Sequence, residues 1–410
     1  MDKILFSAFK EDQYQNNCQI EIQYIAGSYF DPKGKEGTAH FMEHILINPT
    51  DLVKLKKKGV NISAFTNDEL VYFSFNGPYT QDFEYGIRMA FENIRNILKG
   101  DIGRFTNEEI EKERELIKDE IKRCESDFEV QALQEFYRKL YTADHPYVFE
   151  DGKKNLGSEI TLQNINLEDL KTFFENNIKE KNPIVKVYYE GKKENYDELI
   201  KEISKIIESF NYSSANEYPY TQLDKINTNT IDAFIDLNKG DKSYMRVYIA
   251  HISDSEETDP LDKLLVTAWR RGVGTIAYKT SRDIGIAYQI NLYTWLLNKK
   301  RVFLIQFSLK NEDADNKLKK FESVLKNNIQ NYLSNELKSV LENYKIDTKL
   351  YPVTPLTNLD NEISQYKIYK KKIYSLEEIK EKATLISEER LKGALVNIIN
   401  SPSHKVKVVW

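Results

Sequence analysis

The order of strands and helices expected from the sequence recurs once along the chain, and this recurrence constrains the fold more than any single segment does. Alternating apolar and polar residues indicate half-buried strands, and a repeat of about 3.6 residues indicates helices. In the first half, the expected strands are 18–25, 60–66, 69–77 and 182–191. The expected helices of that half are 36–47, 51–59, 80–99, 106–140 and 194–210.

The second half repeats a similar order after a polar segment at 213–228, which has no period and which we interpret as a linker. Its expected strands are 231–237, 243–251, 285–296, 302–309 and 404–410, with helices over 259–282 and between the last two strands. A chain of 410 residues is too long for one core. We therefore expect two similar α+β domains, 1–212 and 229–410, each a mostly antiparallel sheet with helices packed on it.

Charge and apolar content exclude several classes of protein. The formal net charge is −5, with both signs interspersed, so neither nucleic acid nor an anionic membrane surface is an expected partner. No run of 18 apolar residues occurs, so no membrane span is expected, and the first residues lack the apolar region of a secretory signal. Cys18 and Cys124 cannot form a disulfide framework, which favours a cytoplasmic location.

The run His40-Phe41-Met42-Glu43-His44 lies in the expected helix 36–47. Residues four apart share one helix face, with Cβ atoms about 5–6 Å apart, so both imidazoles can bind one zinc ion. Histidines at this spacing often have no function, but the chain contains only 5 histidines, so the whole motif rarely arises by chance. Catalytic zinc usually has three protein ligands and one open position, so a third ligand must come from elsewhere.

Glu43 is expected to face the same cavity without binding the metal. Zinc lowers the pKa of a bound water from 15.7 toward about 7. Glu43 would take the proton of that water and pass it to the leaving amine, as a general base and then an acid. The motif therefore predicts metal-assisted hydrolysis of a peptide bond.

These residues resemble the pitrilysin–insulysin–mitochondrial processing peptidase family, whose hallmark is this inverted zinc motif. The surrounding sequence extends the likeness over the whole chain, at two-domain length. The segments that are similar to the family are Ala26-Gly27-Ser28, Gly37-Thr38-Ala39, Ser63-Ala64-Phe65-Thr66, His145-Pro146-Tyr147, Gly157, Ile160 and Asn182. The resemblance implies a zinc endopeptidase of short, bacterial type, with an insulysin-like (LuxS-like metallohydrolase) fold in each half and one zinc per chain.

The resemblance also implies roles for residues outside the motif. The family's third ligand is a glutamate on a later helix, with another glutamate two helical turns before it, and Glu120 and Glu113 match these positions. Glu120 would bind zinc and Glu113 would orient the site. Without the resemblance, the charged run that contains them predicts only a solvated helix face. The family's substrate-pairing strand matches Ser63, Ala64 and Phe65, which would hold the peptide as an added strand.

In the second domain, the segment 280–288 resembles the family region that binds the substrate at the reacting carbonyl. Arg282 and Tyr288 match its functional residues, although their spacing is one residue shorter than is common, and an ordinary helix-to-strand turn is the alternative. His251 stands alone in that half, and we interpret it as an ordinary strand-end residue.

The resemblance implies that two halves close around the substrate, so a chain of this length needs a partner. A homodimer that supplies Arg282 and Tyr288 in trans is the first expectation, and a paralogous partner is the second. Peptides or unfolded polypeptides are the expected substrates. Three rival interpretations stay open: a non-catalytic structural subunit, a peptide-binding module, and a protease that matures one dedicated precursor.

Overall fold

A computed structural model describes most of the chain, in two compact units. Unit 1 comprises residues 1–127, 149–218 and 355–360, and unit 2 comprises residues 128–148, 219–354 and 361–410. The described residues are 5–46, 49–80, 106–143, 145, 147–148, 156–208, 215–238, 242–254, 261, 265, 276–285, 290–297, 299–329, 355–369 and 376–409. The domain boundary expected at 213–228 stays a prediction.

Unit 1 contains a five-stranded sheet in the order β1-β5-β2-β4-β3. Only the β1–β5 pair is parallel, and the other three pairs are antiparallel. The strands are β1 (Leu5–Glu11), β2 (Asn17–Tyr24), β3 (Asn61–Thr66), β4 (Val71–Pro78) and β5 (Ile184–Gly191). No strand was expected at residues 5–11, and β1 forms there by pairing with β5, which lies far along the chain.

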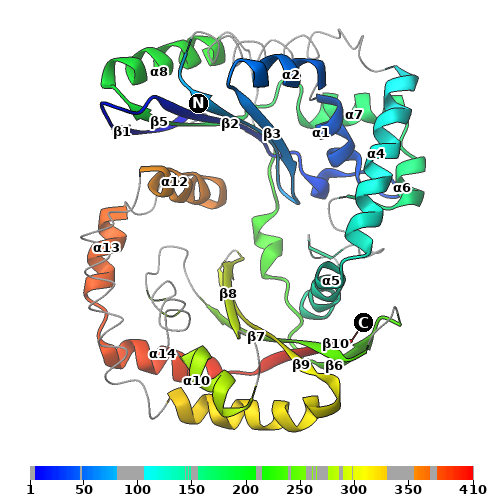
Figure 1. The fold of residues 1–410 in the computed structure, drawn as a ribbon, viewed down its shortest axis with the longest axis vertical. Coiled ribbons are helices and arrows are strands. Elements are labelled where there is room, and N and C mark those ends of the chain that lie inside the picture. The colour runs from blue at the N-terminus through cyan, green and yellow to red at the C-terminus, as the bar shows by residue number, and fades with distance from the viewer. Residues whose placement is uncertain are drawn as a thin grey trace. The chain divides into compact units, whose positions relative to one another are not determined.

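Helices pack on one face of this sheet, where α1, α2 and α8 lie together (Figure 1). The helices of the unit are α1 (Thr38–Leu46), α2 (Pro49–Lys57), α4 (Asn107–Glu125), α6 (Glu159–Gln163), α7 (Leu167–Asn177) and α8 (Lys193–Glu208), with a 3-10 turn η1 (Ser28–Phe30). Alternate side chains of β2, namely Cys18, Ile20, Ile22 and Tyr24, are buried in the core beneath them. The alternation that predicted this strand therefore marks its core face.

The single helix expected over 106–140 is wrong, because it is two helices, α4 and α5 (Phe128–Leu140). Ser126 ends α4: its Oγ donates to the carbonyl of Arg123 at 2.7 Å, and its N–H bonds back to the carbonyl of Lys122. Ser and Asp side chains compete in this way with helical hydrogen bonds, which favours helix ends. The expected helix 80–99 lies outside the described residues.

Unit 2 contains a second five-stranded sheet, in the order β6-β10-β7-β9-β8. Again one pair, β10–β6, is parallel and the rest are antiparallel. The strands are β6 (Asp232–Asp236), β7 (Tyr244–Asp254), β8 (Asn291–Leu296), β9 (Lys300–Lys310) and β10 (Ser403–Val409). Its further elements are α10 (Ile276–Asp283), α13 (Leu376–Thr384), α14 (Glu388–Asn400), η2 (Tyr220–Asp224), η3 (Asn311–Asp313) and a helical segment at 314–329. Helix α12 (Pro355–Tyr369) is divided between the two units.

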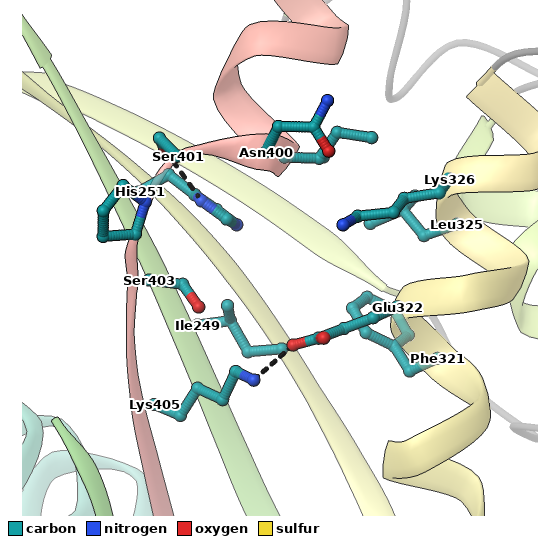
Figure 2. Close-up of a pocket in the computed structure, with 12 residues that line it drawn as sticks. Ile249, His251, Phe321, Glu322, Leu325, Lys326, Asn400, Ser401, Ser403 and Lys405 are labelled. Atoms are coloured by element: carbon teal, nitrogen blue, oxygen red, sulfur yellow. Dashed lines mark hydrogen bonds and ion pairs between the residues drawn. The ribbon is translucent and has the colours of Figure 1, made fainter. Parts of the chain in front are cut away.

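A cavity of about 290 Å³ lies within unit 2, between β7, the helical segment 314–329 and the turn from α14 to β10. Figure 2 shows His251 of β7 on one wall, with its Nδ1 3.2 Å from Ser401 Oγ. Glu322 and Lys405 form an ion pair on another wall. His251 was expected at the end of a strand. It is instead buried within β7.

Both units are mixtures of helices with one mostly antiparallel sheet, so the α+β fold class predicted from the sequence is confirmed. In the described part of the chain, no helix has both the length and the apolar character that crossing a membrane requires.

Candidate metal centre

Helix α1 carries the His-x-x-Glu-His run, and Asp31 fixes where this helix begins. The Asp31 carboxylate accepts hydrogen bonds from the backbone N–H groups of Gly37 and Ala39, both at 2.7 Å. The first N–H groups of a helix have no partner within the helix, and a carboxylate there also suits the helix dipole. Asp31 therefore stabilises the start of the helix, one turn before His40.

Gly37 allows a second chain segment to approach the start of α1. Its φ is +97°, and a Cβ atom at this position would lie 2.6 Å from the carbonyl oxygen of Leu156. A side chain would thus be strained both by the backbone conformation and by contact. The glycine keeps the metal-motif helix packed against the loop before α6.

Three side chains converge where α1 faces α4. The Nε2 atoms of His40 and His44 lie 3.7 and 3.8 Å from the same carboxylate oxygen, Oε2 of Glu120. The two imidazole rings are nearly perpendicular, with centroids 4.7 Å apart. In the described residues, this trio is the set of potential ligands whose atoms all lie within 4.8 Å of one another.

This trio fits a zinc ion. Four ligands at 2.0–2.1 Å in a tetrahedron lie about 3.3 Å from one another, so the 3.7 and 3.8 Å separations require only a small contraction. Two imidazoles and one carboxylate are ligands that zinc accepts in catalytic sites, with the fourth position open. The remaining ring nitrogen of His40, Nδ1, is buried and has no partner among the described residues.

Two further glutamates surround the trio. Glu113 lies two turns before Glu120 on α4, and its Oε2 is 3.1 Å from His44 Nδ1. Such a contact orients an imidazole so that its other nitrogen faces the metal. Glu43 is held differently, because its Oε2 accepts a hydrogen bond from Thr66 Oγ1 at 2.6 Å.

Burial and neighbouring charges shift the pKa values of these groups. Burial lowers the pKa of His40 to about 4, with a further contribution from His44, so this imidazole is neutral at pH 7. Burial also raises the pKa of Glu43, and the Thr66 hydrogen bond opposes this shift. The hydrogen bond with His44 lowers the pKa of Glu120 despite its partial burial. At neutral pH, His40 and Glu120 thus have the protonation states in which they bind a metal.

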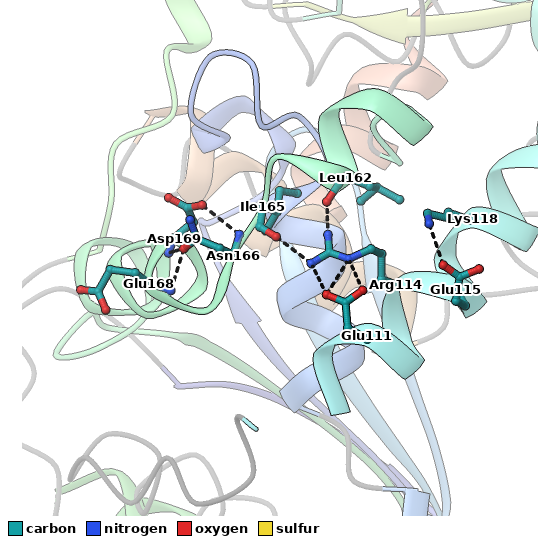
Figure 3. A network of polar contacts seen from close by, with 9 residues as sticks. All are labelled: Glu111, Arg114, Glu115, Lys118, Leu162, Ile165, Asn166, Glu168 and Asp169. Atoms are coloured by element: carbon teal, nitrogen blue, oxygen red, sulfur yellow. Dashed lines mark hydrogen bonds and ion pairs between the residues drawn. The ribbon is translucent and has the colours of Figure 1, made fainter. Parts of the chain in front are cut away.

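Helix α4 is anchored by Arg114, a residue for which the sequence pattern indicated no role. Figure 3 shows its guanidinium donating to the backbone carbonyls of Leu162 and Ile165, and the bond to Ile165 is 2.8 Å long. Glu111 on the same helix accepts from Arg114 as well. Arg114 is buried. Glu113 and Glu120 on the same helix face the histidines. The arginine therefore fixes the helix that presents both glutamates.

Strand β3 is the edge of the sheet among the described strands, since it pairs only with β4. Ser63 and Phe65 are exposed on it and Ala64 is half-buried. The Phe65 ring lies 5.4 Å from the Tyr72 ring on the neighbouring strand. An edge strand offers unpaired backbone groups to which an extended peptide can add.

The second domain holds the candidate substrate-binding residues Arg282 and Tyr288. Arg282 is exposed in the last turn of α10 in unit 2, with its guanidinium carbon 5.2 Å from the centroid of the Tyr278 ring. Tyr288 lies outside the described residues. Their roles in substrate binding stay predictions.

Several known proteins are similar to this chain in sequence. Residues 7–145 match the sequence model of the insulinase family, peptidase family M16. An uncharacterized zinc protease of Rickettsia bellii is 22% identical over 329 residues, which cover 77% of this chain and 73% of that protein. The beta subunit of the bovine mitochondrial-processing peptidase is 26% identical over 171 residues, 39% of this chain and only 32% of that protein.

Solved structures share the fold over almost the whole chain. A protease from Helicobacter pylori has a TM-score of 0.73 at 16% identity, covering 98% of this chain and 96% of that one. A peptidase M16 inactive domain from Pseudomonas fluorescens has a TM-score of 0.72 at 14% identity, covering 98% and 95%. The resemblance stated from the sequence is thereby confirmed for residues 7–145, which hold His40, His44 and Glu120 and match the model of the insulinase family of peptidases, M16.

Proposed function

We propose that this chain is a zinc-dependent endopeptidase that cleaves unfolded peptides or precursor segments. The observation that carries the proposal is the convergence of His40, His44 and Glu120. Glu43 precedes His44 on the same helix and accepts a hydrogen bond from Thr66. The names of the relatives, which include zinc proteases, support the metal and the reaction.

When bound by the two histidines and Glu120, zinc would supply an acidic water and polarise the scissile carbonyl. Glu43 accepts the proton of the attacking water and delivers it to the leaving amine. Its raised pKa, caused by burial, brings the carboxylate closer to the operating pH and so improves it as a proton carrier. Glu113 holds His44 in the orientation that presents Nε2 to the metal.

The substrate would bind as an extra strand along β3, through main-chain hydrogen bonds at Ser63, Ala64 and Phe65. Pairing through the main chain requires an extended segment and depends little on sequence. Folded proteins are therefore poor substrates in this proposal, whereas unfolded peptides of many sequences are accepted.

A second chain would complete the enclosure around the substrate, either another copy or a paralogue. Arg282 and Tyr288 would then reach the reacting carbonyl from the partner. A cytoplasmic location is part of the proposal, consistent with Cys18 and Cys124 both being free thiols.

The test is hydrolysis of a fluorogenic peptide by the purified chain, with zinc per chain measured by elemental analysis. We expect activity that a chelator removes and zinc restores. Glu43→Gln should retain zinc and lose turnover by several orders of magnitude, because it removes the proton acceptor and no ligand. His40→Ala should lose both zinc and activity.

The same assay separates this proposal from the two non-enzymatic interpretations. A non-catalytic subunit would bind no peptide productively and show no chelator-sensitive rate, alone or with a paralogue. If the chain is a peptide-binding module, the wild type and the Glu43→Gln variant should bind the peptide equally well, and neither should cleave it. Near-normal turnover by Glu43→Gln would remove Glu43 as the base.

A further inference from the structure

We propose that Thr66 is a positioning residue that holds Glu43 in the orientation needed to take a proton, an inference that rests on the proposed function. Thr66 Oγ1 donates to Glu43 Oε2 at 2.6 Å, a short bond between two partly enclosed groups. A bond from a hydroxyl to a carboxylate is among the stronger hydrogen bonds in proteins.

The position of Thr66 in its strand supports this role. Along β3 the side chains from Asn61 to Phe65 are exposed or half-buried, and Thr66 alone is buried, with 7% of its surface accessible. It is the last residue of the strand and pairs with Val71. The strand therefore turns its final side chain inward, onto the helix that carries the metal motif.

The bond occupies Oε2 of Glu43, and Oε1 accepts no hydrogen bond from the described part of the chain. Glu43 projects from α1 among His44 and Glu120, whose charges also act on it. A glutamate side chain has three rotatable bonds, so without a fixed partner its carboxylate could turn toward the histidines. Thr66 occupies Oε2 and so directs Oε1 to the place where a proton would be received.

This arrangement also joins the two parts of the proposed reaction. The strand that would bind the peptide by its main chain ends in the residue that holds the base by its side chain. Replacing the hydroxyl changes the base without changing the main chain of β3. The inference therefore predicts a defect in kcat with little change in KM.

The experiment compares a nearly isosteric substitution without the hydroxyl with a smaller one that retains it. Thr66→Val removes the hydroxyl, and Thr66→Ser retains it. Loss of a hydrogen bond to a charged group costs about 1.5–3 kcal/mol, which corresponds to a decrease in kcat of about 10- to 100-fold for Thr66→Val. We expect KM to stay within about twofold, and Thr66→Ser to keep most of the wild-type kcat.

Two measurements separate positioning from a general structural role. Zinc per chain should change little in either variant, because no ligand is touched. In a Glu43→Gln background, Thr66→Val should cause no further loss of rate, since the group it positions is gone. Wild-type kcat in Thr66→Val, or an equal loss in both Thr66 variants, would overturn the inference.

Crystal structures of the zinc-loaded variants test the inference even if no peptide is cleaved, which would itself be the failure of the proposed function. We expect the Glu43 carboxylate to be ordered as in the wild type in Thr66→Ser and displaced or spread over rotamers in Thr66→Val. The same carboxylate position in both variants would show that Thr66 does not hold it.

Discussion

At the scale of single residues, the glutamates of α4 are chemically alike, and the structure separates them by what each one faces. Glu120 approaches both Nε2 atoms, Glu113 approaches His44 Nδ1, and Glu111 binds Arg114. Glu109 is exposed. Position on the helix, rather than charge, therefore determines which carboxylate can be a ligand.

These differences predict a ranking of zinc affinities. Loss of a hydrogen-bonded outer partner typically weakens metal binding by about 10- to 100-fold, which we expect for Glu113→Gln, and Glu120→Gln should cost more because it removes a ligand. Glu109→Gln is the matched control and should bind zinc as the wild type does. Competition with a chromogenic chelator measures all three. Equal affinities for Glu120→Gln and Glu109→Gln would contradict the assignment of Glu120.

At the scale of secondary-structure elements, β3 has one side paired with β4 and no other partner among the described strands. In an antiparallel pair, successive residues point their N–H groups alternately toward the partner strand and away from it. Of the neighbours Ser63 and Ala64, one therefore donates to β4 and the other is directed toward the open edge.

Proline substitutions at these two positions should consequently have different effects. Proline removes the backbone donor, so at the position that faces β4 it breaks a ladder bond and lowers the thermal unfolding midpoint. At the position that faces the open edge, it should leave zinc content and stability nearly unchanged and weaken binding of an extended peptide. Fluorescence anisotropy with a labelled peptide, in a Glu43→Gln background, measures that binding. Unweakened binding in both variants would contradict the strand-addition proposal.

At the scale of the whole molecule, each unit has a core of its own, and unit 2 buries a histidine that plays no part in the proposed chemistry. Burial lowers the pKa of His251 to about 4. A hydrogen bond with the Ser401 backbone and the charge of Glu322 oppose this shift, and Lys405 and His404 add to it. Ser401 Oγ donates to the carbonyl of Ile398, so it accepts from His251 Nδ1, and the neutral imidazole is the stable form.

The unfolding free energy of unit 2 should therefore depend on pH. Between the folded pKa of about 4 and the ordinary value of 6.5, the unfolded chain binds more protons than the folded one, so stability falls as pH falls through this window. From pH 7 to pH 5 the loss from His251 should be about 2 kcal/mol. Urea unfolding of the wild type and of His251→Gln at both pH values measures it. An identical pH dependence in the two proteins would contradict this assignment.

The sequence by itself determined most of the regular elements and the metal motif. Alternation predicted β2 and β4, and the spacing of His40, Glu43 and His44 depends only on the geometry of one helix, so local pattern was sufficient. Glu120 and Glu113 required the family resemblance, because a charged helix face looks the same whether or not a metal lies beside it.

Only the tertiary structure decided the contacts between residues distant in sequence. The bond from Thr66 to Glu43, the anchoring of Arg114 to the carbonyls of Leu162 and Ile165, and the pairing of β1 with β5 all join separate segments. A single sequence records each partner's chemistry but not which partner it meets. That choice depends on how the helices and strands pack, which is settled only when the whole core forms.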